Sequence, residues 1–398
     1  MRTRSLPASA LLPLMLAMPV LCAPAALAPG SLTYASAQDI ACAVPSAAQP
    51  PGETPAELHE LRRFATGAGV RVAVIDTGVA PHPELNHLRP GADFVGDNAL
   101  ADCDSHGTVV AGVIAGRTLG IAPDAEILAV RQTSAHYRGG RGQSVAGDLE
   151  TLASAINNAL DEGARVLNVS VVSCVDPGLA SRIDLNGLRG ALHRAEADGA
   201  VVVAASGNTS ADCEPGFSVI PALFPTVLAV GAREDTHTLA SYSLPAEISA
   251  AGLVPHALAS SGNGWADGTL TRDGSRPYVG TSFAAPVVSG AAALLMQRYP
   301  GITPDHVRTL ITAAAQHGGG AITPHNVISQ LTPDDIAPRD TVTVAPTERT
   351  ASLAVKRFSS VGLGAVVFAL LGVLVLCAVS TWRSKPQPGS APRPPARG

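Results

Sequence analysis

The chain has 398 residues, of which 46% are apolar and only 15% are charged. This length is enough for one large domain with a substantial core and for additional segments. The formal net charge is −5 and the sequence contains no pronounced basic run. It therefore lacks the positive footprint of a nucleic-acid-binding protein, and we expect no nucleic acid among its partners.

Residues 1–28 have the features of a secretory signal peptide. Two arginines precede an apolar segment from Leu11 to Leu21, and Ala26-Leu27-Ala28 forms a cleavage site of the small-x-small type. The apolar segment is short and is interrupted by Pro13 and Pro19, which favours a cleaved signal over a membrane anchor. The chain that follows is therefore expected to be exported.

The exported part begins with an N-terminal extension, residues 29–55. It is polar, rich in proline and alanine and without clear periodicity, which predicts a spacer, except that it contains a cysteine. Cysteines of exported proteins tend to form disulfides, and four of them form an even set here: Cys42, Cys103, Cys174 and Cys213. Their spacing excludes a metal site of the CxxC type, and the sequence alone allows three pairings.

From about residue 56 to residue 320 the sequence predicts alternating strands and helices. The candidate strands are apolar runs at 70–75, 125–130, 165–170, 200–205 and 226–231. The candidate helices lie near 106–116, 146–161, 186–198, 282–297 and 304–315. Continuous apolar runs are typical of parallel strands that are buried on both faces. We therefore expect an α/β domain with a doubly wound, mainly parallel sheet.

Beyond this domain, residues 321–358 are rich in threonine, proline and aspartate, which predicts a linker. Residues 359–381 are predicted to form one transmembrane helix, because the 21 residues from Val361 to Thr381 carry no charge. The tail, 382–398, contains arginine and lysine but no acid. The positive-inside rule therefore predicts a cytoplasmic tail and a domain outside the cell membrane.

Three short segments carry the components of an acyl-transfer site. Asp76 ends an apolar strand and precedes a glycine, at the place where catalytic groups of open α/β sheets gather. His106 opens a predicted helix. Ser282 lies in the first turn of another helix, where free backbone N–H groups and the dipole can hold a developing oxyanion. An aspartate, a histidine and a serine on separate elements can form a nucleophilic triad.

Two other carboxylates are alternative partners for the histidine. Asp102 and Asp104 both precede His106 in the same loop, and neither of them ends a strand. Asp76 is therefore the favoured partner.

A short segment with His82, Glu84 and His87 could suggest a metal site. Prolines at positions 81 and 83 favour a solvated turn instead. We therefore expect no metal site and no cofactor.

The catalytic segments resemble the motifs of subtilisin-like serine proteases, the subtilases. The matching stretches are Val72-Ala73-Val74-Ile75-Asp76-Thr77-Gly78-Val79, Asp104-Ser105-His106-Gly107-Thr108-Val109-Val110-Ala111-Gly112, Ala204-Ala205-Ser206-Gly207-Asn208 and Gly280-Thr281-Ser282-Phe283-Ala284-Ala285-Pro286. The order of aspartate, histidine and serine along the chain is that of subtilisin. The resemblance implies the subtilisin-like fold and a serine endopeptidase that acts on protein or peptide substrates.

The resemblance also implies roles for individual residues. Ser282 would attack a peptide carbonyl, His106 would accept and return the proton, and Asp76 would orient the imidazole. Asn208 would donate its side-chain amide to the oxyanion together with the Ser282 backbone N–H. The substrate would be bound by Ser170, Val172, Ser206 and Gly207.

One departure from the family pattern concerns the substrate. Subtilases usually have Ser-x-Gly along the edge that receives the substrate chain, whereas this sequence has Ser170-Val171-Val172. A branched side chain replaces a hydrogen where the peptide would lie. We expect a narrowed pocket for the residue before the cut, and a preference for alanine or serine there.

Within the subtilases, the chain resembles the mycosins, which are associated with type VII secretion in actinobacteria. The similar features are the signal peptide, the short extension with a cysteine, the subtilase domain and the C-terminal span. They also include Cys103 just before the histidine motif, Cys174 after Asn168-Val169-Ser170, and Cys213 after the asparagine motif.

This closer resemblance implies the disulfides Cys42–Cys103 and Cys174–Cys213. It further implies a single-pass membrane protease with an extracytoplasmic catalytic domain, whose partners are subunits of a type VII secretion membrane complex. Two alternatives stay open. The chain could be mainly a structural subunit that stabilises such a complex, or a general degradative subtilase tethered to the cell surface.

Overall fold

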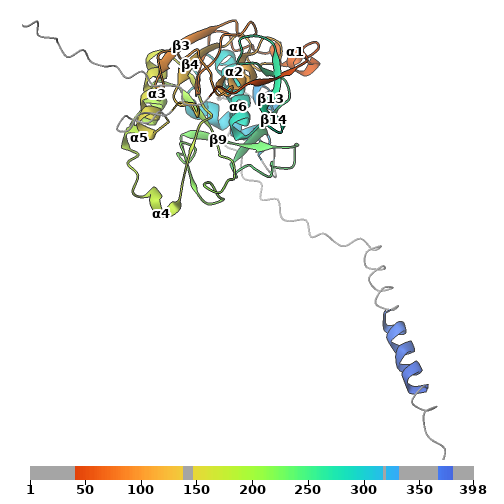
Figure 1. Cartoon of the computed structure of the whole chain (residues 1–398). Helices are drawn as coiled ribbons and strands as arrows, with labels where there is room; N and C mark the ends of the chain where they lie inside the picture. The colour runs from red at the N-terminus through yellow and green to blue at the C-terminus, as the bar shows by residue number, and fades with distance from the viewer. Residues whose placement is uncertain (1–40, 138–146, 317–319, 331–365, 380–398) are drawn as a thin grey trace, which may run out of the picture. The chain divides into compact units, whose positions relative to one another are not determined.

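The computed structural model describes residues 41–137, 147–316, 320–330 and 366–379 (Figure 1). The first three ranges belong to one unit, and residues 366–379 belong to a second unit formed by the C-terminal part of the chain. The signal peptide predicted for residues 1–28 and the tail predicted for 382–398 lie outside the described residues.

The five strands expected from continuous apolar runs form the centre of the domain, and two strands that were not expected, at 88–93 and 248–251, join them at the edges. Seven strands make one sheet: β2 (Arg71–Asp76), β3 (Leu88–Asp93), β4 (Glu126–Arg131), β5 (Val166–Val169), β7 (Val201–Ala205), β9 (Val227–Arg233) and β10 (Ile248–Ala251). Their spatial order is β10-β9-β7-β5-β2-β4-β3, and all neighbours pair in parallel. The order reverses at β2 and β5, so a crevice is expected beyond the carboxyl ends of these two strands.

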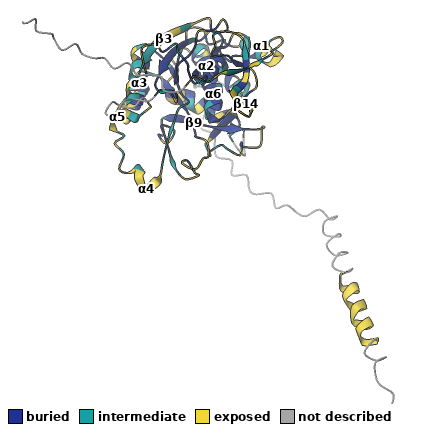
Figure 2. Ribbon diagram, viewed as in Figure 1, coloured by how far each residue is buried: buried dark blue, intermediate teal, exposed yellow. Residues whose placement is uncertain are grey.

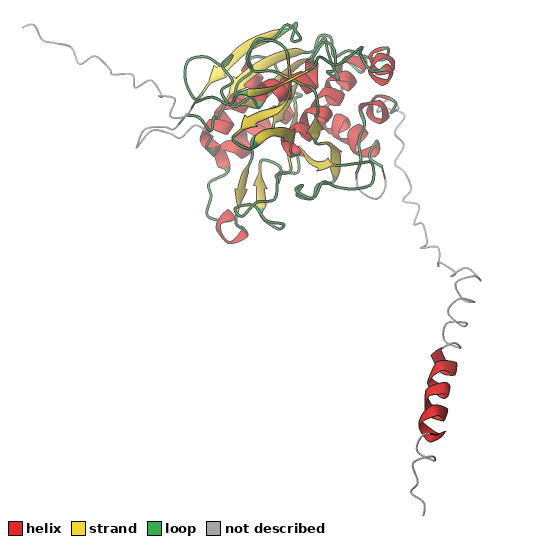
Figure 3. Cartoon of the chain, turned by 45° about the vertical axis from the view of Figure 1, so that its right-hand side comes forward, coloured by secondary structure: helices red, strands yellow, loops and turns green. Residues whose placement is uncertain are grey.

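Helices cover both faces of this sheet (Figure 3). The two large helices of one face are α2 (Gly107–Ala115) and α6 (Thr281–Arg298), and those of the other face are α3 (Leu149–Asp161) and α5 (Asn186–Ala197). Along β2, Val72 and Val74 belong to the core with α2 and α6, while Ala73 and Ile75 belong to the core with α3 and α5. Successive side chains of a strand point to opposite faces, so a strand buried on both sides needs an unbroken apolar run. The predicted doubly wound parallel architecture is confirmed.

A second, antiparallel sheet was not predicted. It contains β1 (Pro45–Ala48), β11 (Leu253–Val254), β12 (Ala257–Leu258), β13 (Trp265–Thr271) and β14 (Gly274–Val279). β1 pairs with β13, and the Ala43 N–H donates to the Cys103 carbonyl at 2.8 Å. The described end of the N-terminal extension is therefore part of the fold and not a spacer. A further pair, β6 (Ser173–Val175) and β8 (Ser218–Ile220), is also antiparallel.

The described fold extends past residue 320. The shorter helices are α1 (Ala56–Arg62), α4 (Pro177–Ala180), α7 (Pro304–Ala313) and α8 (Pro324–Ile328). Val327 and Ile328 of α8 are fully buried and belong to the same core as α6. Figure 2 shows the buried residues gathered in the interior of this domain, whereas the short helix α4 at its edge is mostly exposed. Residues 321–330 therefore belong to the folded domain and not to the expected linker, because two apolar side chains on a short helix complete the core.

The turn with His82 and Glu84 is packed and not solvated, contrary to our expectation. The Glu84 carboxylate accepts hydrogen bonds from the Arg117 guanidinium at 2.8 Å and from the Thr118 N–H at 2.6 Å. His82 is buried, with its Nε2 3.0 Å from the Gly264 carbonyl oxygen. Burial lowers the pKa of His82. These partners, which lie far away in the sequence, replace solvent around the turn.

In the C-terminal unit, residues 366–379 are helical. Among the described residues, no helix combines the length and the apolar character that crossing a bilayer requires.

Gly107 lies where α2 closely approaches the loop after β2. A Cβ atom at Gly107 would lie 2.0 Å from the Gly78 carbonyl oxygen. We expect Gly107→Ala to lower the free energy of unfolding by about 3 kcal/mol, because the backbone of one element must shift. Gly190→Ala is the matched control, since a Cβ atom there meets nothing within 4 Å and the site is an exposed position of α5. Denaturant titration should show this control to be neutral or stabilised by up to about 1 kcal/mol; equal effects of both variants would contradict the prediction.

Candidate active site

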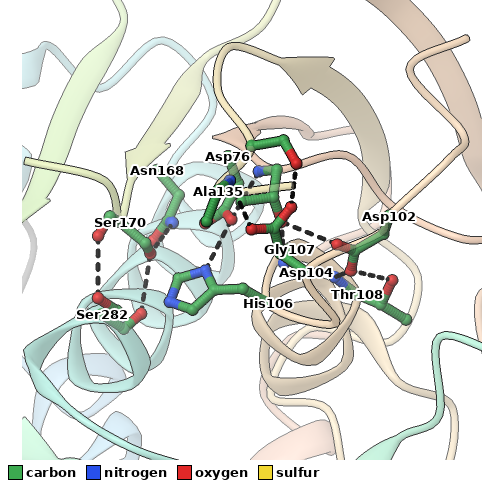
Figure 4. A network of polar contacts seen from close by, with 12 residues as sticks. Asp76, Asp102, Asp104, His106, Gly107, Thr108, Ala135, Asn168, Ser170 and Ser282 are labelled. Carbon is green, nitrogen blue, oxygen red and sulfur yellow. Dashed lines mark hydrogen bonds and ion pairs between the residues drawn. The ribbon is translucent and has the colours of Figure 1, made fainter. Parts of the chain in front are cut away.

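The predicted carboxylate and imidazole, those of Asp76 and His106, are in direct contact. Asp76 is fully buried at the end of β2, and its Oδ1 lies 2.7 Å from His106 Nδ1 (Figure 4). The same oxygen accepts the Thr77 N–H at 2.7 Å. A carboxylate accepts, so the imidazole carries its proton on Nδ1 and leaves Nε2 as an acceptor.

The His106 ring is directed by a sharp turn before α2. Ser105 has a φ of 59°. Among the described residues other than glycine, it is the only one with a positive φ. This left-handed conformation costs about 1–2 kcal/mol for a residue with a side chain. Ser105 is fully buried, and its hydroxyl is hydrogen-bonded to that of Ser260. Packing therefore holds the turn that places His106 over the end of β2.

The environment raises the pKa of His106. Burial acts to lower it, but the charge of Asp76 and the hydrogen bond that His106 donates to Asp76 raise it. The charges of Asp102 and Asp104 act in the same direction. The imidazole therefore binds a proton more tightly than an ordinary histidine.

The two alternative carboxylates make other contacts. Asp104 accepts hydrogen bonds from the Ser134 hydroxyl and, at 2.8 Å, from the Ala135 N–H. Asp102 accepts from the side chains of Thr77 and Thr108. The geometry favours Asp76 as the partner of His106, as expected from its position at a strand end.

Ser282 lies at the start of α6, and its carbonyl and hydroxyl both contact Ser170. The Ser282 hydroxyl donates to the Ser170 carbonyl at 2.9 Å, and the Ser170 hydroxyl donates to the Ser282 carbonyl at 2.8 Å. The Ser282 carbonyl is available because the residue four positions later is Pro286, which has no N–H to donate. In this structure the nucleophile candidate is thus bonded to a backbone carbonyl and not to His106.

Asn208 is anchored so that its amide nitrogen faces the site. Its Oδ1 accepts from the Thr281 N–H at 3.0 Å and from the Thr281 hydroxyl at 3.1 Å. The donor half of the amide, Nδ2, therefore remains for another acceptor, next to the N-terminal N–H groups of α6. Two donors at this position can stabilise a developing oxyanion.

These side chains line one cleft of about 780 Å³. His106, Asn208 and Ser282 lie in its wall, and so do three of the expected substrate-binding residues, Ser170, Val172 and Gly207. The fourth, Ser206, is buried, and its hydroxyl donates to the Leu244 carbonyl at 2.9 Å. The cleft has the size of a typical ligand site.

The four cysteines form the pairs that the closer resemblance implies. Cys42 is joined to Cys103, three residues before His106. Cys174 is joined to Cys213, and both of these lie in the wall of the cleft. One disulfide therefore ties the N-terminal extension to the histidine loop, and the other connects two walls of the cleft.

Sequence reasoning missed the polar connection beneath the serine. Asn168 is fully buried in β5, donates to the Ser170 hydroxyl at 2.8 Å and accepts from the Ser289 hydroxyl of α6 at 2.8 Å. The available signal was an asparagine inside an apolar strand, since a buried amide requires partners. The role of Thr281 as the anchor of Asn208 had no comparable signal.

Comparison with known proteins gives consistent matches. The model of the subtilase family, Peptidase S8, matches residues 67–332. Mycosin-1 of Mycobacterium tuberculosis is 38% identical over 304 residues, which cover 67% of this chain and 68% of that protein. A crystal structure of MycP1 from the ESX-1 type VII secretion system has a TM-score of 0.69 at 32% identity and covers 75% of this chain and 92% of that one. A chain in the structure of an intact ESX-5 inner membrane complex has a TM-score of 0.68 at 27% identity, covering 86% of this chain and 94% of that one.

The raised pKa of His106 gives a testable link between pH and stability. Because the pKa is higher in the folded state, the Asp76–His106 pair stabilises the fold fully below the ordinary histidine value, and this contribution is lost as the pH rises through the folded pKa. We expect the loss of unfolding free energy in Asp76→Asn to be larger at pH 6 than at pH 9. NMR titration should show a lower His106 pKa in the variant; an unchanged His106 pKa would contradict the assignment.

Proposed function

This chain belongs to the subtilase family of serine proteases and to its mycosin group, and on that premise we propose that Asp76, His106 and Ser282 are its catalytic triad. The observation that carries the proposal is the 2.7 Å contact between Asp76 Oδ1 and His106 Nδ1, beside a cleft that Ser282 also lines. The buried carboxylate fixes the tautomer of the imidazole and stabilises its cation.

In the proposed reaction, the Ser282 Oγ forms a bond to the carbonyl carbon of a peptide while its proton passes to His106 Nε2. The oxyanion of the tetrahedral intermediate accepts hydrogen bonds from Asn208 Nδ2 and the Ser282 N–H. The C–N bond then breaks, and His106 returns the proton to the leaving amine. A water molecule, deprotonated by the same imidazole, hydrolyses the acyl-enzyme and regenerates the serine.

The first step of this sequence is a rotation of the Ser282 side chain. The hydroxyl bonded to the Ser170 carbonyl must turn toward His106, which requires a change between staggered rotamers about the Cα–Cβ bond. We propose that an extended substrate assists this rotation. Its backbone N–H replaces the hydroxyl at the Ser170 carbonyl, as in the addition of a strand to an exposed edge.

We propose a setting at the outer face of a cell membrane, with a type VII secretion complex as the partner. The 21 uncharged residues from Val361 to Thr381, with basic residues on both sides, support a single membrane span. Residues 1–28 support export by a signal peptide. The likeness to a chain of an ESX-5 inner membrane complex supports association with subunits of such a complex.

The same likeness favours a second candidate function, that of a structural subunit. A domain can dock on an assembly whether or not its triad is intact, so both functions can exist in one chain. A general degradative subtilase at the cell surface is the third candidate, and it requires no partner complex.

The catalytic proposal predicts that two variants lower kcat to different degrees. We expect Ser282→Ala to lower kcat by about 10⁶-fold. Asn208→Ala should lower kcat by about 10²–10³-fold, because one oxyanion donor is lost. A fluorophosphonate probe should label the wild type and the exposed-serine control Ser261→Ala, but not Ser282→Ala. Labelling of Ser282→Ala would refute the assignment.

The same variant separates the candidate functions in the source organism. If the chain acts mainly as a processing enzyme, Ser282→Ala should abolish processing of exported proteins as deletion does. Restoration of secretion by Ser282→Ala in a deletion strain would instead assign secretion to the structural role. Normal secretion in the deletion strain, together with broad loss of proteolysis, would favour the degradative function.

The narrowed substrate pocket predicts a change in specificity. Val172 lies in the wall of the cleft at the position where subtilases usually have glycine. We expect the wild type to prefer alanine or serine before the cut. Val172→Gly should raise kcat/KM for phenylalanine or leucine, relative to alanine, by at least about tenfold. Profiling a peptide library with both proteins measures this, and a strong preference of the wild type for phenylalanine or leucine would contradict it.

A further inference from the structure

A second buried carboxylate, Asp102, lies between the elements that carry Asp76 and His106 (Figure 4). Its Oδ1 accepts the Thr77 hydroxyl at 2.8 Å. Its Oδ2 accepts the backbone N–H of Thr108 at 2.8 Å and the Thr108 hydroxyl at 2.6 Å. Thr77 follows Asp76 directly, and Thr108 lies two residues after His106. One carboxylate therefore holds donors from the end of β2 and from the start of α2.

Further hydrogen bonds close this network. The Thr77 hydroxyl oxygen accepts the Gly107 N–H at 3.1 Å, and the Thr108 hydroxyl oxygen accepts the Ala80 N–H at 2.9 Å. The residue at the N-cap position of α2 is His106, whose side chain does not cap the helix. Asp102 thus supplies the missing side-chain acceptor and a negative charge at the N-terminus of α2.

We propose that Asp102 is a positioning residue, which fixes the end of β2 against the start of α2 and so holds Asp76 and His106 in contact. The proposal rests on the proposed catalytic role of these two residues. They lie 30 positions apart in the sequence and on different elements, so their 2.7 Å contact requires that the elements keep a fixed separation. A small misplacement of a base is enough to lower a catalytic rate about 10²-fold.

Asp102 also acts through its charge. It raises the pKa of His106, as Asp76 and Asp104 do, and so stabilises the imidazolium that forms during catalysis. Burial raises the pKa of Asp102 itself to about 6, against the hydrogen bonds from Thr108 and Thr77, and the charge of Asp76 adds to the rise. Tyr278 of β14 also faces the charge of Asp102, which acts to raise the pKa of its phenol after the larger effect of burial. Protonation of the Asp102 carboxyl turns one acceptor oxygen into a donor and so weakens the network.

The test is Asp102→Asn, which keeps the shape of the side chain but removes its charge and one acceptor. We expect a 10- to 100-fold lower plateau kcat, a KM within threefold of the wild type, and a shift of the acid limb of kcat/KM to lower pH. NMR should show a lower pKa for His106. The proposal is overturned if the plateau kcat and the His106 pKa are both unchanged.

Glu84→Gln is the matched control. Glu84 is a buried carboxylate that, like Asp102, accepts from a backbone N–H, but its partners Arg117 and Thr118 follow the C-terminal end of α2, whereas His106 precedes the N-terminal end. This variant should lose stability without moving the pH profile. An equal shift of the acid limb in Glu84→Gln would assign the effect to general destabilisation and overturn the proposal.

If Asp102→Asn does not fold, two further variants test the same network. Thr77→Val and Thr108→Val each remove one arm of the network, and each should lower kcat by a smaller factor. Their double variant should lose less than the product of the single losses, because both act through Asp102; strict additivity would overturn the proposal. The His106 titration does not depend on turnover, so it separates failure of this proposal from failure of the catalytic assignment.

Discussion

The close contact between the end of β2 and the start of α2 is the constraint on which the rest of the site depends. A Cβ atom at Gly107 would lie 2.0 Å from the Gly78 carbonyl oxygen, so only glycine permits this approach. The approach allows the 2.7 Å contact between Asp76, which is fully buried, and His106, which is partly exposed in the cleft. A buried carboxylate attracts an imidazolium more strongly than a fully solvated one does. The backbone geometry therefore sets the electrostatics of the base.

The serine side of the site depends on α6, a helix that is buried along most of its length. Pro286 interrupts the hydrogen bonds of its first turns and leaves the Ser282 carbonyl for the Ser170 hydroxyl. Asn168 continues this connection to Ser289, so β5 and α6 are joined by polar contacts inside an apolar core. Buried polar groups that are fully paired fix one arrangement of the elements around them. The nucleophile candidate is thus placed by the same contacts that join the helix to the sheet.

Two disulfides and the strand β1 attach peripheral segments to the domain. The Cys42–Cys103 disulfide and the strand β1 attach the N-terminal extension beside the histidine loop. The Cys174–Cys213 disulfide lies in the wall of the substrate cleft. Each disulfide limits the unfolded ensemble and so stabilises the segments that it joins. Both disulfides therefore fix segments beside the candidate active site.

The sequence by itself determined five of the seven strands of the central sheet, its main helices and the identity of the subtilase motifs; β3 and β10 were not expected. Apolar runs, small residues and glycines act locally, so strands such as β2 and helices such as α6 follow from short windows of sequence. The second sheet, the extension of the fold to Ile328 and the packed turn at Glu84 were missed or wrongly expected. These features depend on partners far away in the sequence, such as β1 with β13 or Glu84 with Arg117. Only the tertiary structure decided which carboxylate contacts His106 and how Asp102, Asn168 and Thr281 support the site, because a hydrogen bond between distant residues leaves no periodic trace in the chain.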